Sequence, residues 1–390
     1  MDRTILHADC NGFYASVECV QNPELRKVPM AVGGDAESRH GIILAKNELA
    51  KKYNIKTAET IWQAKRKCPD LVIVPPRHRL YHEYSKRVFE IYTRYTELVE
   101  SFGLDEAWLD VTASQKLFGD GKKIADELRQ VVKAETGLTL SVGVSFCKVF
   151  AKLGSDYKKP DATTVFDYNN WQKYIYPMSA DTLLYVGRST KESLLRLGIK
   201  TIGDIAKTDK KILLQSLGKA GEMLYNFANG LDNSPVKSIY DVEEVKSVGK
   251  GFTFDHDLTS EDEIKSGIYS LSEEVAARLR EKGLKCKTVQ VQIKTPEFKV
   301  IQRQKPLSHP TFLSHEIRNT AMEILKSSWN IGSPIRMLTV TANNLIDEKS
   351  AGTYQLSLFD EPKEDNKKTE KLERTIDALK EKYGKTLFKK

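Results

Sequence analysis

Cysteine is scarce in this chain of 390 residues, and its five cysteines lie far apart. No two of them form a Cys-x-x-Cys pair, which excludes the usual zinc knuckles and dithiol redox motifs. An odd and scattered set does not build a disulfide framework either, so we expect free thiols and a cytoplasmic location. The five are Cys10, Cys19, Cys68, Cys147 and Cys286.

Long apolar runs are also missing. No segment approaches the ~20 apolar residues that a membrane-spanning helix needs. The stretch from Met1 to Asp9 lacks the apolar core of a secretion signal, so we expect neither export nor membrane contact. Hydrophobic residues still make up 40% of the chain and charged residues 29%, which is enough to build real cores. This length predicts roughly two to four domains.

Positive charge is only modestly in excess over negative charge. The net charge is +8, from 61 Lys and Arg against 53 Asp and Glu, which is compatible with a polyanionic partner without proving one. The distribution says more, because nine basic residues and only two acidic ones lie between Arg278 and Lys305. Such a run can also be an ordinary solvated face, so it indicates nucleic acid only together with other features.

The first half of the chain mixes strand and helix patterns, which predicts an α+β domain. We expect strands at Thr4–Ala8, Met30–Val32, Leu71–Val74 and Thr139–Ser145, with a tight hairpin over Ser101–Thr112. We expect helices that begin at Gly12 or cover Ile42–Tyr53, Thr60–Lys67, Tyr81–Glu100, Lys122–Thr136 and Val149–Lys158.

The second half changes character twice. From about Trp171 the pattern predicts short helices, and from about Val242 it predicts two strands and two helices. Residues 347–390 contain few apolar residues and many Lys and Glu, which is typical of a mobile tail. Within that tail a helical spacing predicts one short helix, with the residues Leu372, Ile376, Leu379 and Tyr383.

Three carboxylates could meet at one edge of the first sheet. Asp9 ends the first strand, and the pair Asp105-Glu106 lies in the turn of the hairpin. Each alone could be a solvated acidic residue, but three together would repel and resist ionisation. Mg²⁺ prefers carboxylates together with phosphate oxygens. Two such ions about 3.5–4 Å apart would stabilise both oxygens of an in-line phosphoryl displacement.

Four motifs in order strongly resemble a Y-family DNA polymerase of the bacterial DNA polymerase IV type. They begin at Asp9 (DCNGFYASVE), Leu104 (LDEAWLDVT), Lys148 (KVFAK) and Lys158 (KKP). The resemblance covers residues 1 to about 360. It implies an α+β, multidomain right-hand polymerase, with a palm of mixed sheet plus helices, fingers, a helical thumb and an α/β little finger.

The resemblance also implies domain boundaries. The palm would be residues 1–10 and 78–168, and the fingers 11–77. The thumb with its helix-hairpin-helix would be residues 169–236, and the little finger 242–346. The mobile tail would carry a clamp-binding peptide at 355–359.

The implied reaction is attack of a primer 3′-OH on the α-phosphate of a dNTP, with release of pyrophosphate. Asp9 and Asp105 would hold two Mg²⁺ ions, with Mn²⁺ as an alternative, and Glu106 would be the third catalytic acid. The backbone carbonyl of Cys10 would be a further metal ligand. Synthesis would be template-dependent and error-prone, as in translesion synthesis, and without proofreading, because no segment resembles an exonuclease.

Tyr14 matches the family's steric gate against the ribose 2′-OH; from the residues alone it could equally be a core aromatic, with Phe13 packed beside it. Lys159 and Lys51 would bind the nucleotide. Many relatives carry Tyr and Arg where this chain has Glu48 and Lys51, so Lys46 or Lys52 could substitute. Bulky residues over the nascent pair could narrow the range of tolerated lesions; they are Ile42 and Leu44.

DNA-holding parts follow from the same resemblance. Residues 184–190 resemble a helix-hairpin-helix with a turn at Gly187, and a second turn would lie at Lys219; an ordinary helix connection remains the alternative. The basic run falls in the little finger. There we expect phosphate contacts from the side chains of Lys287, Lys294, Lys299, Arg303 and Lys305.

A short tail peptide would complete the set of partners. Residues 355–359 resemble the pentapeptide that docks bacterial polymerases on the sliding clamp, the β subunit, although a featureless tail stretch is the alternative. The partners implied are therefore primer-template DNA, dNTPs and the clamp, for a monomer in the bacterial cytoplasm near the nucleoid. The clamp-binding side chains would be Gln355, Leu356, Leu358 and Phe359.

Two other functions fit some of these features. A catalytically silent, clamp-tethered DNA-binding scaffold would keep the basic segments and the tail peptide, but it would not need all three acids. A nucleotidyl cyclase on a related palm would keep the acids, but it would not need the thumb-like turns or the clamp peptide. A polymerase accounts for all of these features together.

Overall fold

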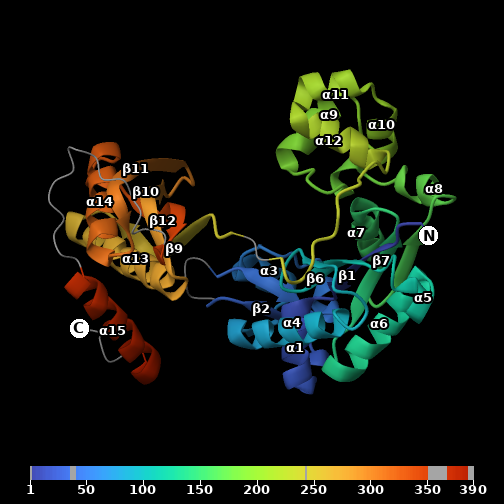
Figure 1. The fold of residues 1–390 in the computed structure, drawn as a ribbon, viewed down its shortest axis with the longest axis horizontal. Helices are drawn as coiled ribbons and strands as arrows, with labels where there is room; N and C mark the ends of the chain where they lie inside the picture. The colour runs from blue at the N-terminus through green and yellow to red at the C-terminus, as the bar shows by residue number, and fades with distance from the viewer. Residues whose placement is uncertain (1, 36–40, 242–243, 350–366, 385–390) are drawn as a thin grey trace. The chain divides into compact units, whose positions relative to one another are not determined.

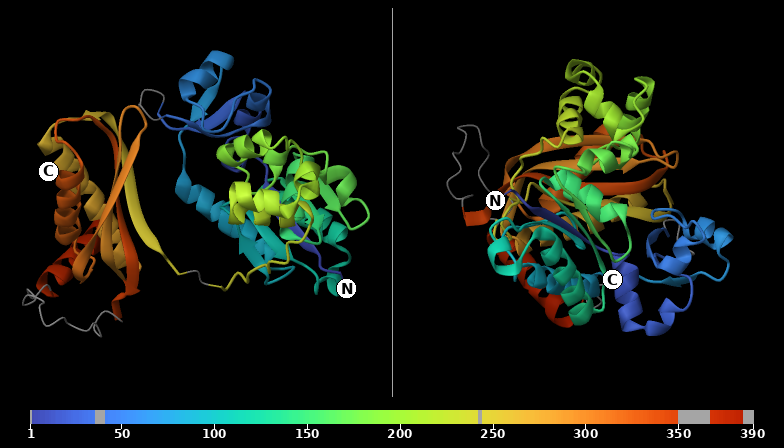
Figure 2. Two further views of the ribbon diagram at one scale, coloured as in Figure 1. Left: turned by 90° about the horizontal axis from the view of Figure 1, so that it is seen from above. Right: turned by 90° about the vertical axis from the view of Figure 1, so that its right-hand side faces the viewer.

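The computed structural model describes residues 2–35, 41–241, 244–349 and 367–384. These residues form two compact units, which divide at residues 242–243 (Figure 1 and Figure 2). No helix in the described ranges is long and apolar enough to cross a membrane.

A five-stranded sheet forms the centre of the first unit, in the order β5-β6-β1-β7-β8. All neighbours are antiparallel except β7 and β8. The expected first strand and the expected hairpin are both confirmed, since β5 and β6 pair directly. The strands are β1 (Ile5–Cys10), β5 (Val99–Ser101), β6 (Glu106–Asp110), β7 (Leu140–Ser145) and β8 (Thr163–Phe166).

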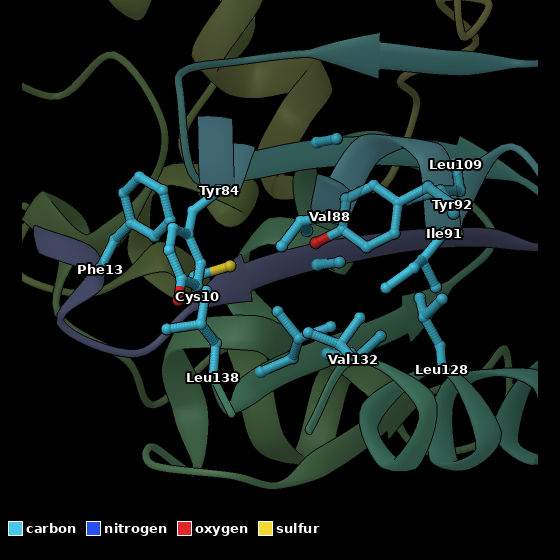
Figure 3. Packing of buried hydrophobic residues seen from close by; sticks show 14 of the residues in the cluster. Cys10, Phe13, Tyr84, Val88, Ile91, Tyr92, Leu109, Leu128, Val132 and Leu138 are labelled. Carbon is cyan, nitrogen blue, oxygen red and sulfur yellow. The ribbon is translucent and has the colours of Figure 1, made fainter. Parts of the chain in front are cut away.

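Alternation along β1 assigns its side chains to two faces of the sheet. Leu6, Ala8 and Cys10 join a large core with α4 (His78–Tyr92) and α6 (Gly121–Thr136), where Figure 3 shows aromatic and aliphatic side chains around Cys10. The other face of β1 carries Ile5, His7 and Asp9, and α7 (Lys148–Tyr157) covers it.

Helix α7 approaches strand β7 unusually closely. A Cβ atom on Gly143 would lie only 1.9 Å from the backbone oxygen of Ala151 and 2.5 Å from the backbone nitrogen of Ser155. Gly154 faces Gly143 across the same contact. The missing side chains therefore let α7 lie directly on the sheet, where it presents Lys152 to the end of β1.

A smaller sheet follows β1 in the chain, with the order β3-β2-β4. It consists of β2 (Met30–Gly33), β3 (Ile43–Lys46) and β4 (Val72–Val74). Short helices accompany it: α1 (Phe13–Gln21), η1 (Pro23–Arg26), α2 (Glu48–Lys51) and α3 (Ile61–Lys67).

Two helix boundaries in this half were predicted wrongly. The segment 42–53 is not one helix, because residues 43–46 pair with β2 and only α2 is helical. The helix expected to reach Glu100 ends at Tyr92, because the chain turns there to enter β5. In both places long-range strand pairing overrides a local helical spacing.

Short helices follow, as predicted, around a core that they share with residues of α7 and β8. Trp171 and Leu194 lie in this core. The helices from here to the end of the unit are α8 (Trp171–Ile175), η2 (Ala180–Thr182), α9 (Arg188–Arg196), α10 (Ile202–Lys207), α11 (Lys210–Leu217) and α12 (Lys219–Ala228), and α5 (Gln115–Phe118) precedes α6.

The second unit is a four-stranded antiparallel sheet in the order β11-β10-β12-β9, packed against two helices. The prediction of only two strands was wrong, because the sheet also contains β9 and β12, which pair with each other, and β12 pairs with β10 as well. The elements are β9 (Ser247–Leu258), α13 (Glu261–Glu281), β10 (Leu284–Lys294), β11 (Val300–Thr311), α14 (Ser314–Ser328) and β12 (Ile335–Asp347).

The expected C-terminal helix is confirmed as α15 (Lys367–Tyr383). It belongs to the second unit through ion pairs, since Glu373 and Asp377 both pair with the buried Arg280, and Glu370 pairs with Lys285. The proposed clamp peptide, residues 355–359, lies outside the described residues.

The close contact between α7 and β7 gives a stability prediction. Gly143→Ala should lower the free energy of unfolding by at least ~2 kcal/mol, because the new methyl group overlaps backbone atoms that cannot move independently. Urea unfolding followed by tryptophan fluorescence measures this, since Trp62, Trp108 and Trp171 all lie in the first unit.

Gly187→Ala is the matched control, because a Cβ there would meet nothing within 4 Å. Equal unfolding midpoints for the two variants would contradict the close contact.

Candidate active site

Three carboxylates converge at one end of the β1–β6 pair. Asp9 lies directly opposite Glu106 in the antiparallel register. Asp105 precedes Glu106, and its carbonyl oxygen accepts a hydrogen bond of 2.9 Å from the backbone N–H of Cys10. Two segments far apart in the sequence therefore bring three acids together.

Burial and the charges of neighbouring acids make Asp105 and Glu106 hard to ionise. The pKa of Asp105 is raised to about 6, first by burial and then by the charges of Asp9 and Glu106. Burial also raises the pKa of Glu106. The cluster therefore needs nearby positive charge to stay ionised at neutral pH.

Two lysines supply positive charge. The ammonium group of Lys152 contacts both Asp9, at 3.2 Å, and Glu106. Lys159 approaches the same Asp9 oxygen at 2.8 Å and also pairs with Asp156 at 2.7 Å. Burial alone would lower the pKa of each lysine, but Asp9 and the neighbouring acids raise both.

A buried histidine lies behind the acids. The Nδ1 atom of His7 is 2.8 Å from the hydroxyl of Ser155, and its Nε2 atom has no hydrogen-bond partner and is 3.6 Å from Glu106. Burial, followed by the charge of Lys152, holds the pKa of His7 well below its usual value. A neutral imidazole therefore borders the carboxylates.

The donor chemistry of this cluster suits a divalent cation. Within the part of the chain that the structure describes, no three or more His, Cys, Asp or Glu side chains already stand as a metal-ligand set. Lysine ammonium groups contact the carboxylates instead. Mg²⁺ and Mn²⁺ prefer oxygen donors, so a divalent ion could bind these carboxylates in place of the lysine ammonium groups.

A pocket of about 360 Å³ adjoins the acids. Gly12 lies in its wall, where the chain turns from β1 into α1 in the left-handed conformation, with φ of 55°. A Cβ on Gly12 would lie 3.1 Å from the backbone oxygen of Lys46, so a glycine suits this turn. The pocket is lined by Asp9, Cys10, Asn11, Gly12, Phe13, Tyr14, Leu44, Ala45, Lys46, Lys51, Thr57, Asp105 and Lys159.

Tyr14 forms one wall of this pocket and is held by other rings. Its ring stacks on Tyr81 at 4.2 Å between centroids, with 15° between the planes, and His78 meets it edge-on at 6.0 Å. Tyr81 in turn donates a 2.7 Å hydrogen bond to the buried carboxylate of Glu18. Phe13 is buried beside it.

Two lysines line the pocket on the side formed by β3 and α2, and each has a polar partner. Lys51 lines the pocket, but its ammonium group is 2.5 Å from Glu48. Lys46 also lines the pocket and donates to the hydroxyl of Thr57 at 3.2 Å. Of the two lysines considered as substitutes for the missing tyrosine and arginine, Lys46 lines the pocket.

The two glycine turns expected in the helical region are present. Gly187 caps the start of α9, and a Cβ on it would meet nothing within 4 Å. Lys219 is the first residue of α12, after Gly218 in a left-handed conformation with φ of 63°.

Register decides where the basic side chains of the second unit point. Gln290 and Gln292 on β10 pair with Gln304 and Gln302 on β11, so the face away from the helices is polar and largely uncharged. Lys294 shares that face. The other four basic residues lie elsewhere. Lys299 is exposed next to the turn between β10 and β11, and Lys287 lies beside the bulge in β10. Arg303 and Lys305 pair with Val291 and Val289, so they share the face that the helices cover.

Sequence reasoning missed the roles of three polar residues at this site: Lys152, His7 and Thr57. Lys152 had a usable signal, because it follows Lys148 by one helical turn, on a helix beside Lys159. His7 had only the alternation that places it on the face of Asp9. Thr57 lies in a loop with no pattern of its own.

Family comparisons agree with this architecture. The impB/mucB/samB family model matches residues 8–156, and the C-terminal domain model of that family matches residues 245–358. A model described as the thumb domain of DNA polymerase iota matches residues 183–232.

Relatives match over nearly the whole chain. DNA polymerase IV of Acetivibrio thermocellus is 48% identical over 98% of this chain and 96% of its own length. DNA polymerase IV of Clostridium kluyveri is 34% identical over 100% of this chain and 98% of its own length.

A solved Y-family polymerase chimera, Dbh-Dpo4(243-245)-Dbh, shares the fold with a TM-score of 0.78, at 22% identity over 88% of this chain and 99% of that one. The palm-like sheet, the helical thumb region and the antiparallel little-finger sheet thus agree with these comparisons: the chain belongs to the DNA polymerase IV group of the Y-family, the translesion DNA-directed DNA polymerases.

Proposed function

We propose that Asp9, Asp105 and Glu106 catalyse transfer of a nucleotide from a dNTP to a primer 3′-OH, with two divalent metal ions. The observation that carries this proposal is the meeting of the three acids beside a pocket of about 360 Å³. The pocket has a cationic side and an aromatic wall, as a nucleoside triphosphate requires.

Asp9 and Asp105 would hold Mg²⁺, or Mn²⁺ in its place, with the Cys10 carbonyl as a further ligand. When bound, the two ions lower the pKa of the primer hydroxyl and neutralise the triphosphate. Glu106 serves as the third acid, near the attacking hydroxyl.

The chain's own groups position the nucleotide. Lys159, which contacts Asp9 at 2.8 Å, turns its ammonium group to the triphosphate. The first turn of α1 adds backbone N–H groups, which favour negative charge. Lys46 and Lys51 approach from the fingers. Tyr14 packs against the sugar and excludes a 2′-OH, because Tyr81 prevents it from retreating.

We also propose how DNA is held. The palm comprises residues 1–10 and 78–168, the fingers 11–77, the thumb 169–236 and the little finger 242–346. Phosphates contact the backbone at Gly187 and Lys219, and the little finger adds Lys294 and Lys299 on or beside its open face. Lys287, Arg303 and Lys305 reach phosphate only from the edge or the helix side, and Lys305 must leave Glu323, which is 2.7 Å away.

The remaining proposals concern fidelity and location. Synthesis is error-prone and without proofreading, a proposal that membership of the translesion DNA polymerases supports. The chain works as a monomer in the cytoplasm, near the nucleoid. The tail peptide, with Gln355, Leu356, Leu358 and Phe359, tethers it to the sliding clamp.

The catalytic proposal predicts the effect of Asp105→Ala. Primer extension with Mg²⁺ and dNTPs should fall by at least ~10³-fold, because the ions' contribution of several kcal/mol is lost. Binding to primer-template DNA should persist and should weaken as salt rises.

Asp110→Asn, at the other end of β6, is the matched control and should extend the primer normally. Extension by Asp105→Ala at the control rate would exclude the assignment. Intact DNA binding by wild type without any extension would favour the scaffold, and pyrophosphate release without a primer would favour the cyclase.

The gate proposal predicts that Tyr14→Ala raises ribonucleotide incorporation by ~10-fold or more relative to dNTP use. The reason is that removal of the ring leaves room for the 2′-OH. Single-nucleotide insertion with dNTP and NTP measures the ratio, and Tyr240→Ala, with 75% of the Tyr240 side chain exposed, is the control. An unchanged ratio in Tyr14→Ala refutes the gate.

The tether proposal predicts that deletion of residues 355–359 abolishes stimulation by a loaded clamp and spares extension without it. Primer extension with and without the clamp measures both. A scrambled peptide of the same composition is the control and should also lose stimulation. Persistent stimulation in the deletion variant argues for a clamp contact elsewhere.

A further inference from the structure

The outward face of α3 carries an exposed tryptophan. Trp62 is 66% exposed, whereas Trp108 and Trp171 are buried and Trp329 is half-buried. The helix does not need this ring for its own packing, because Ile61 and Ala64 fill the core on the other side. A large apolar ring left in solvent suggests that something covers it in use.

Two cations share this face with Trp62. The guanidinium of Arg66 lies 4.9 Å from the centre of the Trp62 ring, and Lys65 follows Trp62 by three residues on the same side of the helix. Helix α3 contains no acidic residue. Across the described ranges, neither cation forms an ion pair with an acidic side chain.

A purely structural reading explains only part of this face. Basic residues in the last turn of a helix favour its dipole, which accounts for Lys65 and Arg66. The helix dipole does not account for the exposed indole of Trp62. Capping of the helix does not need the indole either, because Thr60 and Gln63 already form a capping box at the N-terminus.

The patch lies on a helix that is joined by backbone contacts to the strand lining the nucleotide pocket. Ile42, next to β3, bridges to Thr60 at the start of α3, and the N–H of Ile43 donates to Glu59 at 2.9 Å. Strand β3 supplies Leu44, Ala45 and Lys46 to the pocket lining. A template strand that leaves the pocket across β3 therefore reaches α3 next.

We propose that Trp62, Arg66 and Lys65 bind the unpaired template strand ahead of the pairing site. A base stacks on the indole and the cations contact adjacent phosphates. This inference rests on the proposed polymerase function and adds a binding site to it. Aromatic rings between cations bind single strands of any sequence, because every base has a face that can stack.

A protein partner fits this face less well. The cores of protein interfaces are depleted of lysine, and Trp62 stands among charged and polar neighbours rather than in an apolar patch. The exposed neighbours on α3 are Gln63, Lys65, Arg66 and Lys67. The chemistry therefore favours a strand that offers both bases and phosphates.

The test compares two DNA substrates with the full-length chain. One is a primer-template whose template continues as an unpaired overhang of ~8 nucleotides. The other ends at the templating base. Equilibrium binding gives a ratio of affinities, which isolates the overhang from the rest of the DNA contacts.

Trp62→Ala should lower this ratio by ~10-fold, Trp62→Phe should retain most of it, and Arg66→Gln should give an intermediate loss. Tyr240→Ala is the exposed-aromatic control and should leave it unchanged. If Trp62→Ala and wild type give the same ratio, the proposal is wrong and a protein partner becomes the better explanation of the exposed ring. The readout does not require catalysis, so a chain that fails to extend primers can still pass or fail it.

Discussion

Repulsion among Asp9, Asp105 and Glu106 is the constraint on which the rest of the first unit depends. The β1–β6 register brings the acids together, and burial, followed by the charges of Asp9 and Glu106, raises the pKa of Asp105 to about 6. Positive charge must therefore be brought to the same point. The close contact at Gly143 lays α7 on the sheet and delivers Lys152, while Lys159 follows from the end of that helix. The packing of α7 on β7 therefore brings a positive charge to the buried acids.

The same constraint bears on what the two lysines would do in the proposed mechanism. In the proposed mechanism, divalent ions would replace the lysines that contact the acids, and a lysine released from Asp9 would then meet the triphosphate. The aromatic wall is built differently, because Tyr14 is held by stacking on Tyr81 and by the Glu18 hydrogen bond behind it. A cationic side and a stacked aromatic wall together suit the proposed site, which would bind any dNTP and exclude the ribose 2′-OH.

Much of this was predictable from local patterns. Asp9 follows an apolar strand and Asp105-Glu106 lies in a hairpin turn, so their meeting could be inferred. Other features depend on contacts that no local pattern encodes. Residues 43–46 form a strand because they pair with β2, and β9 forms a strand because it pairs with β12. The basic run was visible in the sequence, but only register shows that Arg303 and Lys305 share a face with Val291 and Val289.

Manganese binding to the DNA-free protein tests the central claim most directly. Because Asp105 has a pKa of about 6, a bound ion must displace a proton at pH 5 but not at pH 7. Titration followed by electron paramagnetic resonance should therefore give an affinity ~10-fold weaker at pH 5 than at pH 7. Asp105→Asn should bind weakly at both values, and Asp110→Asn should behave as wild type. Equal affinity at pH 5 and pH 7, or unchanged binding in Asp105→Asn, would contradict the account.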